Sequence, residues 1–193
     1  MKLLEEKVLA EGKAINENIL KVDGFINHQV DPELMKAIGE DFARHFKDAG
    51  ITKVATIESS GIAPALTTAA ALRIPLLILK KSPSKVLNDN MYQTVVTSYT
   101  KGNSYELTLA KHLISDEDHV LIIDDFLANG EAATGAVRLI RKAHATIAGI
   151  GILIEKSFQP GRGKLEEQGL NVYSQVRIGR LDAGVIELLA ADA

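Results

Sequence analysis

Runs of consecutive apolar residues alternate along this chain with segments whose apolar residues recur every three or four positions. The first pattern is typical of strands buried on both faces, and the second of helices that cover a sheet. Strands are predicted over residues 51–57, 74–80, 118–124, 145–155 and 171–178, with an edge strand over 184–189. Helices are predicted over residues 2–11, 31–50, 62–72, 130–143 and 164–168. This alternation predicts the α/β class, with a doubly wound and mostly parallel sheet.

Two segments depart from the alternation. Residues 13–30 show no clean period, and residues 82–104 are polar and irregular around the alternating stretch MYQTVVTSY. Alternation of this kind predicts a hairpin, which we expect to stand away from the main sheet. Between them, Asp31 is expected to cap a helix that has Pro32 in its first turn and closes at Gly50.

Composition narrows the class of protein. The chain has 193 residues, 46% of them apolar, which fits a single domain over residues 1–193. The net charge of −3 does not suggest a nucleic-acid partner, and no apolar run approaches the roughly 20 residues of a membrane span. The absence of cysteine excludes disulfides and thiolate metal sites. The amino-terminal residues lack the apolar core of a signal peptide, so we expect a cytoplasmic protein.

The strongest candidate for chemistry is the run VLIIDDFLANGEA over residues 120–132. Asp124 and Asp125 follow four apolar residues, and a predicted helix begins near Gly130. Backbone N–H groups at a helix start suit a phosphate, and ionised carboxylates accept hydrogen bonds from vicinal hydroxyls. One loop can therefore hold a sugar phosphate. The spacing alone also fits a solvated acidic turn, or the acid pair of a Mg²⁺ or phospho-aspartyl site.

Ligands of doubly wound sheets bind at the carboxyl ends of the strands. The loops after residues 57, 80, 124 and 155 are therefore expected to converge on one site. Histidine spacing suggests no metal site, and neither a dinucleotide glycine motif nor a P-loop is present in the sequence.

The 120–132 run resembles the motif that binds phosphoribosyl pyrophosphate (PRPP) in type I phosphoribosyltransferases. Its DDFLANGEA variant is similar to that of the bacterial xanthine phosphoribosyltransferases, and the resemblance extends through residues 21–32, 51–65, 113–130 and 148–162. It implies that Asp124 and Asp125 are the catalytic acids. It implies that PRPP is bound by Ala128, Asn129, Gly130, Glu131, Ala132, Ser59, Ser60, Gly61 and Lys81. From the residues alone, Ser59 or Ser60 is also expected to cap the next helix, and Lys80 and Lys81 to face water.

The same resemblance implies a site for a purine base beneath a hood formed by about residues 1–30. Lys156 would donate to an exocyclic oxygen of the base, Phe158 would stack on its ring, Leu20 would cap the ring and Asn27 would bond its 2-position. An ammonium group favours a 6-oxopurine over adenine, whose 6-amino group is itself a donor. The residues alone leave open a salt bridge for Lys156 and a turn or helix cap for Asn27.

The resemblance implies an enzyme of purine salvage that transfers phosphoribose from PRPP to xanthine, giving xanthosine 5′-phosphate (XMP) and pyrophosphate. Mg²⁺ would arrive bound to PRPP rather than at a metal site of the protein. Residues 82–104 would form a mobile hairpin loop over the site, and the enzyme would be a homodimer. Hypoxanthine or guanine as the base remains an alternative. So does a non-enzymatic PRPP-sensing regulator, although no DNA-reading module precedes residue 31.

Overall fold

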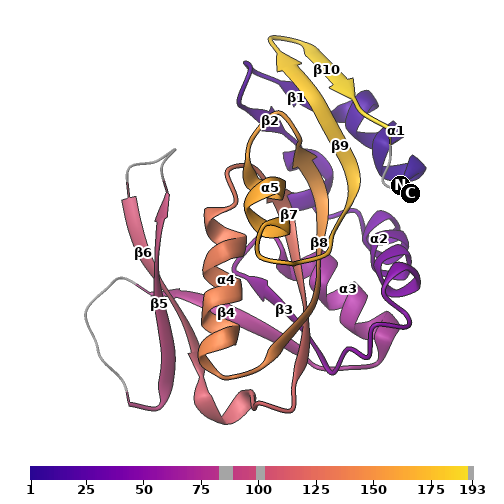
Figure 1. The fold of residues 1–193 in the computed structure, drawn as a ribbon. Helices are drawn as coiled ribbons and strands as arrows, with labels where there is room; N and C mark the ends of the chain where they lie inside the picture. Colours follow the sequence, from indigo (N-terminus) through magenta and orange to yellow (C-terminus); the bar gives the residue numbers. More distant parts are fainter. Residues whose placement is uncertain (83–88, 99–102, 191–193) are drawn as a thin grey trace.

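A single eight-stranded sheet forms the centre of the computed structural model, which describes residues 1–82, 89–98 and 103–190 (Figure 1). Its strands are β3 (Lys53–Ile57), β4 (Leu76–Ser82), β5 (Met91–Ser98), β6 (Asn103–Ala110), β7 (His119–Leu127), β8 (Thr146–Lys156), β9 (Val172–Asp182) and β10 (Val185–Leu188). They lie in the order β10-β9-β8-β7-β3-β4-β6-β5. The stretch from β9 to β4 is parallel, and β10, β6 and β5 are antiparallel additions at the two edges. The predicted mostly parallel sheet is confirmed.

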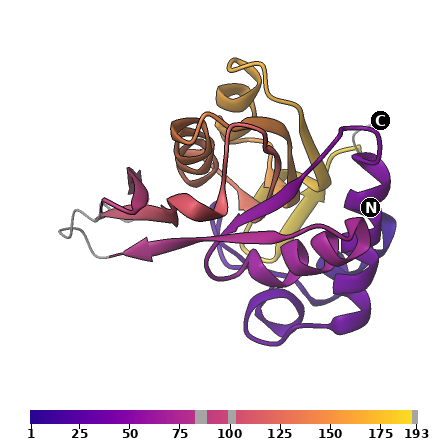
Figure 2. The same ribbon diagram turned by 90° about the horizontal axis from the view of Figure 1, so that it is seen from below.

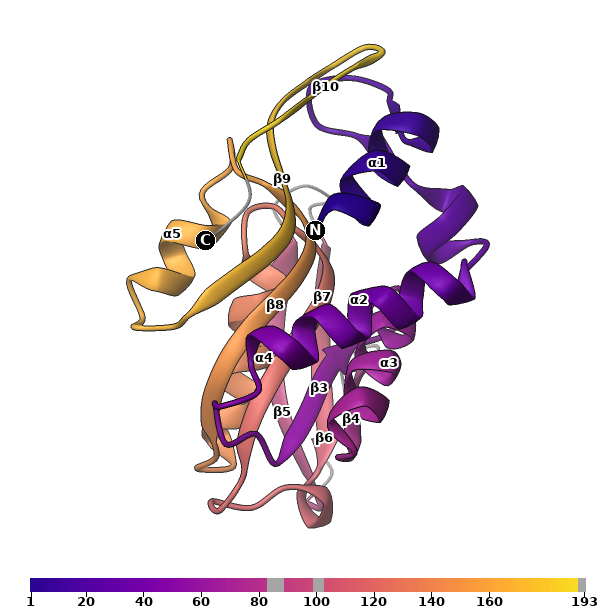
Figure 3. The ribbon, with the colours of Figure 1, turned by 90° about the vertical axis from the view of Figure 1, so that its right-hand side faces the viewer.

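Helices cover both faces of this sheet. They are α1 (Lys2–Glu11), α2 (Pro32–His45), α3 (Ile62–Leu72), α4 (Glu131–Lys142) and α5 (Gly161–Glu166). In Figure 3, α2 and α3 lie in front of the strands and α4 lies behind them. The predicted doubly wound arrangement is therefore confirmed. Among the described residues, no helix is both long and apolar enough to span a bilayer.

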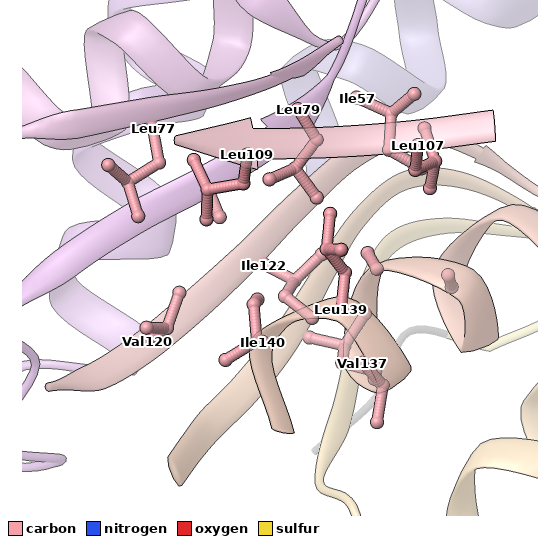
Figure 4. Close-up of a cluster of buried hydrophobic side chains, with 14 of the residues drawn as sticks. Ile57, Leu77, Leu79, Leu107, Leu109, Val120, Ile122, Val137, Leu139 and Ile140 are labelled. Carbon is pink, nitrogen blue, oxygen red and sulfur yellow. The ribbon is translucent and has the colours of Figure 1, made fainter. Parts of the chain in front are cut away.

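Strand β7 shows why the central strands read as uninterrupted apolar runs. Val120 and Ile122 pack into the core beneath α4, where Figure 4 shows them near Ile140. Leu121 and Ile123, which alternate with them, pack into the core beneath α2 and α3. Since successive side chains of a strand point to opposite faces, a strand covered on both sides needs an apolar residue at every position.

Helix α2 begins as predicted but ends earlier. The Asp31 side chain accepts a hydrogen bond from the Leu34 backbone N–H at 3.1 Å, and Pro32 is the first helical residue. The helix ends at His45 rather than near Gly50, which adopts a positive φ of 65°. Phe46 is buried and continues the apolar period past the end of the helix. Periodicity therefore extended the predicted helix into the following turn. In contrast, α5 begins at Gly161, three residues before its predicted start.

The predicted hairpin is present, but its separation from the main sheet was wrong. Strands β5 and β6 pair antiparallel, and β6 also pairs with β4 at Lys80 and Thr108. Figure 2 shows the pair projecting from one edge of the molecule. Alternation reveals that one face is buried without revealing what covers it, and here Leu107 packs beneath α4. Residues 83–88 and 99–102 of the predicted mobile loop lie outside the described residues, so its mobility stays a prediction.

The first 30 residues pack onto the body of the domain rather than forming a separate core. Helix α1 is followed by the short strands β1 (Lys13–Ala14) and β2 (Leu20–Lys21) and by a π-helical turn over Asp23–Asn27. Phe25 lies in the same core as α2, and the Gly184 N–H donates to the Ala14 carbonyl. Turns and two-residue strands have no period, which explains why residues 13–30 showed no clean pattern, whereas the helix predicted over 2–11 is confirmed as α1. The description of this segment as a hood over a base stays a prediction.

Candidate active site

A cavity of about 390 Å³ lies where the carboxyl ends of β3 and β4 meet β7. Its lining consists of Ile57, Glu58, Ser59, Ser60, Lys81, Asp124, Asp125, Phe126 and Ala132. The predicted convergence of the loops after residues 57, 80 and 124 is therefore confirmed. The loop after residue 155 contributes no residue to this lining. Lys156, the last residue of β8, lies beside the cavity, with its Nζ 5.5 Å from the centroid of the Phe126 ring.

The two acids lie within strand β7, not after it. The predicted strand ended at Asp124, whereas β7 continues to Leu127 and pairs Asp124 with Ile152 of β8. Pairing with β3 ends at Ile122, so both acids lie past the last paired residues of these two strands. The tertiary pairing with the longer β8 extends the strand through residues whose sequence reads as a loop. A strand holds the two carboxylates more rigidly than a turn would.

Burial controls the charge of these acids. Asp124 is 9% exposed, and its Oδ1 accepts the backbone N–H of Asp125 at 3.1 Å. Burial and the neighbouring Asp125 carboxylate raise the pKa of Asp124 well above its usual range. Burial also raises the pKa of Asp125. The cleft therefore holds two carboxylates whose charges repel each other until a ligand with hydroxyl groups or a cation compensates them.

The raised pKa values of the acids predict opposite pH trends for activity and stability. Ionised carboxylates accept hydroxyl donors better than protonated ones, so kcat/KM for PRPP should rise as pH increases through the raised pKa of the pair in the free protein. In that range the native state binds more protons than the unfolded state, so the pair's contribution to stability falls as pH increases. Profiles of kcat/KM and of unfolding free energy against pH, for the parent and Asp125→Asn, measure both trends. Parallel trends in the parent would contradict this account.

The loop between β3 and α3 approaches the acids closely because of Gly61. A Cβ added at Gly61 would lie 3.2 Å from Asp124 Oδ1 and 2.3 Å from the Thr56 hydroxyl. Gly61 is also the N-cap of α3 and provides no side-chain cap, so the alternative role of Ser59 or Ser60 as a helix cap is wrong. The Glu58–Ser59 peptide bond is cis. Ser59, Ser60 and Gly61 thus border the cleft, and their contact with pyrophosphate stays a prediction.

Glu58 distinguishes the two lysines at the end of β4. Its carboxylate accepts the backbone N–H of Lys81 at 2.6 Å and the ammonium of Lys80 at 3.2 Å. The Lys81 N–H, followed by the Lys80 ammonium, overcomes burial and holds the pKa of Glu58 below its usual range. Lys80 is therefore paired with a carboxylate. Lys81 lines the cleft, which supports the choice of Lys81 as the contact for pyrophosphate.

The loop between β7 and α4 encloses a second cavity of about 90 Å³, which is lined by residues 126–133. Gly130 caps α4 with a φ of 85°, a conformation that favours glycine. This arrangement directs the first backbone N–H groups of α4 toward the loop, as an anion site at a helix start requires. The two cavities share Phe126 and Ala132 in their linings. They are adjacent, as two phosphate groups of one ligand would need.

Helix α5 supports this loop from behind. The Gly161 N–H donates to the Ala128 carbonyl at 3.0 Å, and Lys164 Nζ donates to the Asn129 carbonyl at 2.8 Å. A Cβ added at Gly161 would lie 2.3 Å from the Ala128 oxygen. The loop conformation therefore depends on a helix that is distant in sequence.

Of the residues predicted to bind a base, Lys156 has a contact that links it to the segment near Leu20. Lys156 Nζ donates to the Asn18 carbonyl at 2.5 Å, which links β8 to the segment just before Leu20 and replaces the alternative salt bridge. Burial lowers the pKa of Lys156. Leu20 is 7% exposed within the core, Asn27 is exposed at the end of the π-helical turn, and Phe158 is 41% exposed. Their contacts with a base stay predictions.

Several residues that shape the site were missed by the sequence analysis. Phe126 is the aromatic ring beside Lys156, and its place directly after the acids was a signal within the motif itself. Glu58 was passed over because a single acid after a strand has no characteristic spacing. Gly161 and Lys164 act across the fold, and no local pattern connects them with residues 128–130.

Comparison with known proteins agrees with this geometry. Residues 29–169 match the family described as "Phosphoribosyl transferase domain". The chain is 64% identical over 189 residues to a xanthine phosphoribosyltransferase of Agathobacter rectalis, which covers 98% of each chain. It is 59% identical over 189 residues to xanthine phosphoribosyltransferase 1 of Clostridium botulinum, which covers 98% of this chain and 100% of that one. The crystal structure of adenine phosphoribosyltransferase from Rhodothermus marinus aligns with a TM-score of 0.75 over 92% of this chain and 100% of that one. Because the two sequences are only 21% identical, this likeness concerns the fold alone.

The sheet, the paired acids and the two loops beside them define an α/β protein with a cleft at the carboxyl ends of its central strands. The chain belongs to the type I phosphoribosyltransferase family.

Proposed function

We propose that this protein transfers the phosphoribosyl group of PRPP to xanthine, giving XMP and pyrophosphate in purine salvage. The observation that carries the proposal is the placement of one buried and one half-buried carboxylate between two loops suited to phosphate, in a chain 64% identical to a xanthine phosphoribosyltransferase. The identity covers 98% of both chains, so the base-binding segments are included.

Each part of PRPP has a matching group in the proposed complex. The backbone N–H groups of residues 128–132 bind the 5′-phosphate, as does the dipole of α4. Residues 59–61 and Lys81 bind the pyrophosphate, and Asp124 and Asp125 accept hydrogen bonds from the ribose hydroxyls. Mg²⁺ belongs to this complex as part of the PRPP substrate, and the carboxylate oxygens at the cleft are ligands of the kind it takes.

The chemistry requires positioning and electrostatics rather than a covalent intermediate with the protein. The bond between C1 of the ribose and the pyrophosphate oxygen breaks, and a nitrogen of the base forms the new bond to C1 from the opposite face. The proton that the base loses in this step is released to solvent. Positive charge develops on the ribose as pyrophosphate leaves, and the two carboxylates stabilise it at short range. Lys81 compensates the charge on the leaving pyrophosphate.

Recognition of the base rests on Lys156. Its ammonium lies beside the Phe126 ring, so a purine stacked on an aromatic face there would present an exocyclic oxygen to it. In the proposed complex Lys156 leaves the Asn18 carbonyl to donate to the base, Leu20 and Phe158 contact the ring, and Asn27 reads its 2-position. Because an ammonium group has no acceptor, adenine is disfavoured.

An assay of the purified protein with PRPP, Mg²⁺ and each of xanthine, guanine, hypoxanthine and adenine tests the proposal. We expect xanthine to have the highest kcat/KM and adenine the lowest. Formation of pyrophosphate without a nucleotide product, or a preference for adenine, would contradict it. A preference for guanine or hypoxanthine would retain the reaction and overturn the assignment of the base.

Removing the Lys156 ammonium should damage recognition of the base specifically. We expect Lys156→Met to lower kcat/KM for xanthine by about 10- to 100-fold, the typical cost of a lost charged hydrogen bond, with KM for PRPP nearly unchanged. Lys142→Met is a matched control, because Lys142 also donates to a backbone carbonyl, that of Gln93, but on the outer side of α4. An equal loss in both variants would exclude a direct contact between Lys156 and the base.

We also propose that the protein is a homodimer acting in the cytoplasm, as the family resemblance implies. An exposed apolar side chain such as Leu66 on α3, which is 56% exposed, is suited to burial by a second copy. Light scattering should give twice the chain mass of 20.8 kDa, and a monomer mass at assay concentrations would contradict the dimer.

A further inference from the structure

We infer that Tyr105 is a positioning residue that holds the Lys81 ammonium over its ring, away from the acid pair and ready for the pyrophosphate of PRPP. The inference rests on the proposed function for its kinetic consequence. Its structural part concerns the unliganded protein and can be tested without catalysis.

The sheet register places the two side chains together. Lys81 on β4 pairs with Leu107 on β6, and partners in an antiparallel pair project from the same face. Tyr105 lies two positions from Leu107 on the same strand, so it shares that face, which is the face covered by α4. Lys81 Nζ lies 5.3 Å from the centroid of the Tyr105 ring, within the distance of a cation–π interaction.

The acid pair and the Tyr105 ring are alternative partners for the Lys81 ammonium, and the choice between them affects the site. Lys81 lines the same cleft as Asp124 and Asp125, and its charge opposes, without overcoming, the rise that burial causes in the pKa of both acids. A direct ion pair would occupy the oxygens that the ribose hydroxyls need. The negative face of the half-buried Tyr105 ring offers the exposed Lys81 side chain an alternative position for its ammonium.

The surroundings of Tyr105 agree with a place at the wall of the site. Its ring packs against the core beneath α4. Burial, with the charges of Asp124 and Glu131, raises the pKa of the phenol, so the ring stays neutral and its face remains attractive to a cation.

The same hairpin contains a matched control. Tyr92 on β5 packs against the same core and has the Lys111 ammonium 5.6 Å from its ring centroid. Tyr92 pairs with Leu109, and Lys111 directly follows the end of β6, so this second pair lies toward the opposite end of β6 from Tyr105. Both tyrosines therefore pack against the same core and have a lysine ammonium over the ring, but only Tyr105 contacts a lysine that lines the cleft.

Kinetic measurements separate positioning from folding. We expect Tyr105→Leu to raise KM for PRPP about two- to fivefold, the range that a cation–π contact of this strength supports, with kcat and KM for xanthine within about twofold of the parent. Tyr105→Phe, which keeps the ring, should restore the parent KM, and Tyr92→Leu should not change it. In a Lys81→Met background, Tyr105→Leu should have no further effect on KM. An equal rise in Tyr92→Leu, or an undiminished effect without the lysine, would overturn the inference.

A spectroscopic measurement distinguishes failure of this inference from failure of the proposed function. In the unliganded protein, the Lys81 ε-CH₂ protons should show an upfield ring-current shift that disappears in Tyr105→Leu and persists in Tyr105→Phe. Loss of the shift in both variants, or its absence from the parent, would overturn the inference even for an active enzyme. If the shift is found but no purine accepts phosphoribose, the proposed function fails while the contact stands.

Discussion

Asp125→Asn should reduce kcat for phosphoribosyl transfer by about 10²- to 10³-fold while the protein remains folded. Removing one group that stabilises developing charge in a buried site typically has a cost of this size. The substitution keeps the shape of the side chain and removes one of two adjacent carboxylates whose pKa values are raised by burial. Since repulsion with Asp124 disappears, we expect the melting temperature to stay constant or to rise by a few degrees, about 2–4 °C per kcal/mol for a chain of this length. Steady-state kinetics and calorimetry measure the two effects.

Asp118 provides the control, because it lies just before the other end of the same strand and has the opposite environment. Its carboxylate accepts hydrogen bonds from Lys53 Nζ at 2.8 Å and from the Thr52 hydroxyl at 2.9 Å. Burial would raise the pKa of Asp118, but the hydrogen bonds from Lys53, Ser115 and Thr52 hold it below the usual range. Asp118→Asn should therefore lower stability by about 1–3 kcal/mol and leave kcat nearly unchanged. A stable Asp125→Asn variant with parent turnover would contradict the assignment of the catalytic acid.

Gly161→Ala should strongly weaken binding of PRPP although residue 161 is not predicted to touch the substrate. Its Cβ would lie 2.3 Å from the Ala128 carbonyl oxygen and 3.0 Å from the Gly130 N atom, so the loop at 128–132 must move. We expect KM for PRPP to rise at least about tenfold and stability to fall by about 1–3 kcal/mol, the cost of overpacking a close contact. The loop conformation that directs N–H groups toward the 5′-phosphate would be lost. Titration with PRPP and thermal unfolding check the two effects.

Gly163→Ala is the matched control two residues further along α5. A Cβ at Gly163 would meet no atom within 4 Å, and the residue is helical. Alanine favours helix over glycine by up to about 1 kcal/mol, so this variant should be as stable as the parent or more so, with unchanged KM for PRPP. If Gly161→Ala also left KM unchanged, the loop would not depend on its contact with α5.

The part of the active site that could be predicted from the sequence is the part formed by residues close together in the chain. The run from Val120 to Ala132 combines a strand, two acids and a helix start within 13 residues, so its chemistry could be inferred before its geometry was known. Central strands and most helices followed from period alone, because a strand covered on both faces is apolar throughout. The Asp31 cap likewise needed only its neighbours, and its bond to the Leu34 N–H was found.

The predicted end of β7 and the predicted position of the hairpin were wrong because pairing with a segment distant in the chain determines each of them. Strand β7 passes through Asp124 and Asp125 because β8 pairs with it as far as Leu127, and no residue of β7 records the length of its neighbour. The hairpin joined the sheet because β4 extended far enough to pair with β6.

The sequence by itself determined the α/β class, the succession of central strands and helices along the chain, and the acid pair with the loop at 128–132, because each depends on residues that are near one another in the chain. The tertiary structure alone decided which lysine pairs with Glu58, which aromatic ring lies beside Lys156 and what holds the loop at 128–132 in shape. The first depends on the hydrogen bond between Glu58 and the end of β4, and the second on the contact of Lys156 with the Phe126 ring of the neighbouring strand. The third depends on the hydrogen bond between the Gly161 N–H and the Ala128 carbonyl. Such contacts arise only when the packing of the sheet and helices brings separate segments within hydrogen-bond or van der Waals distance.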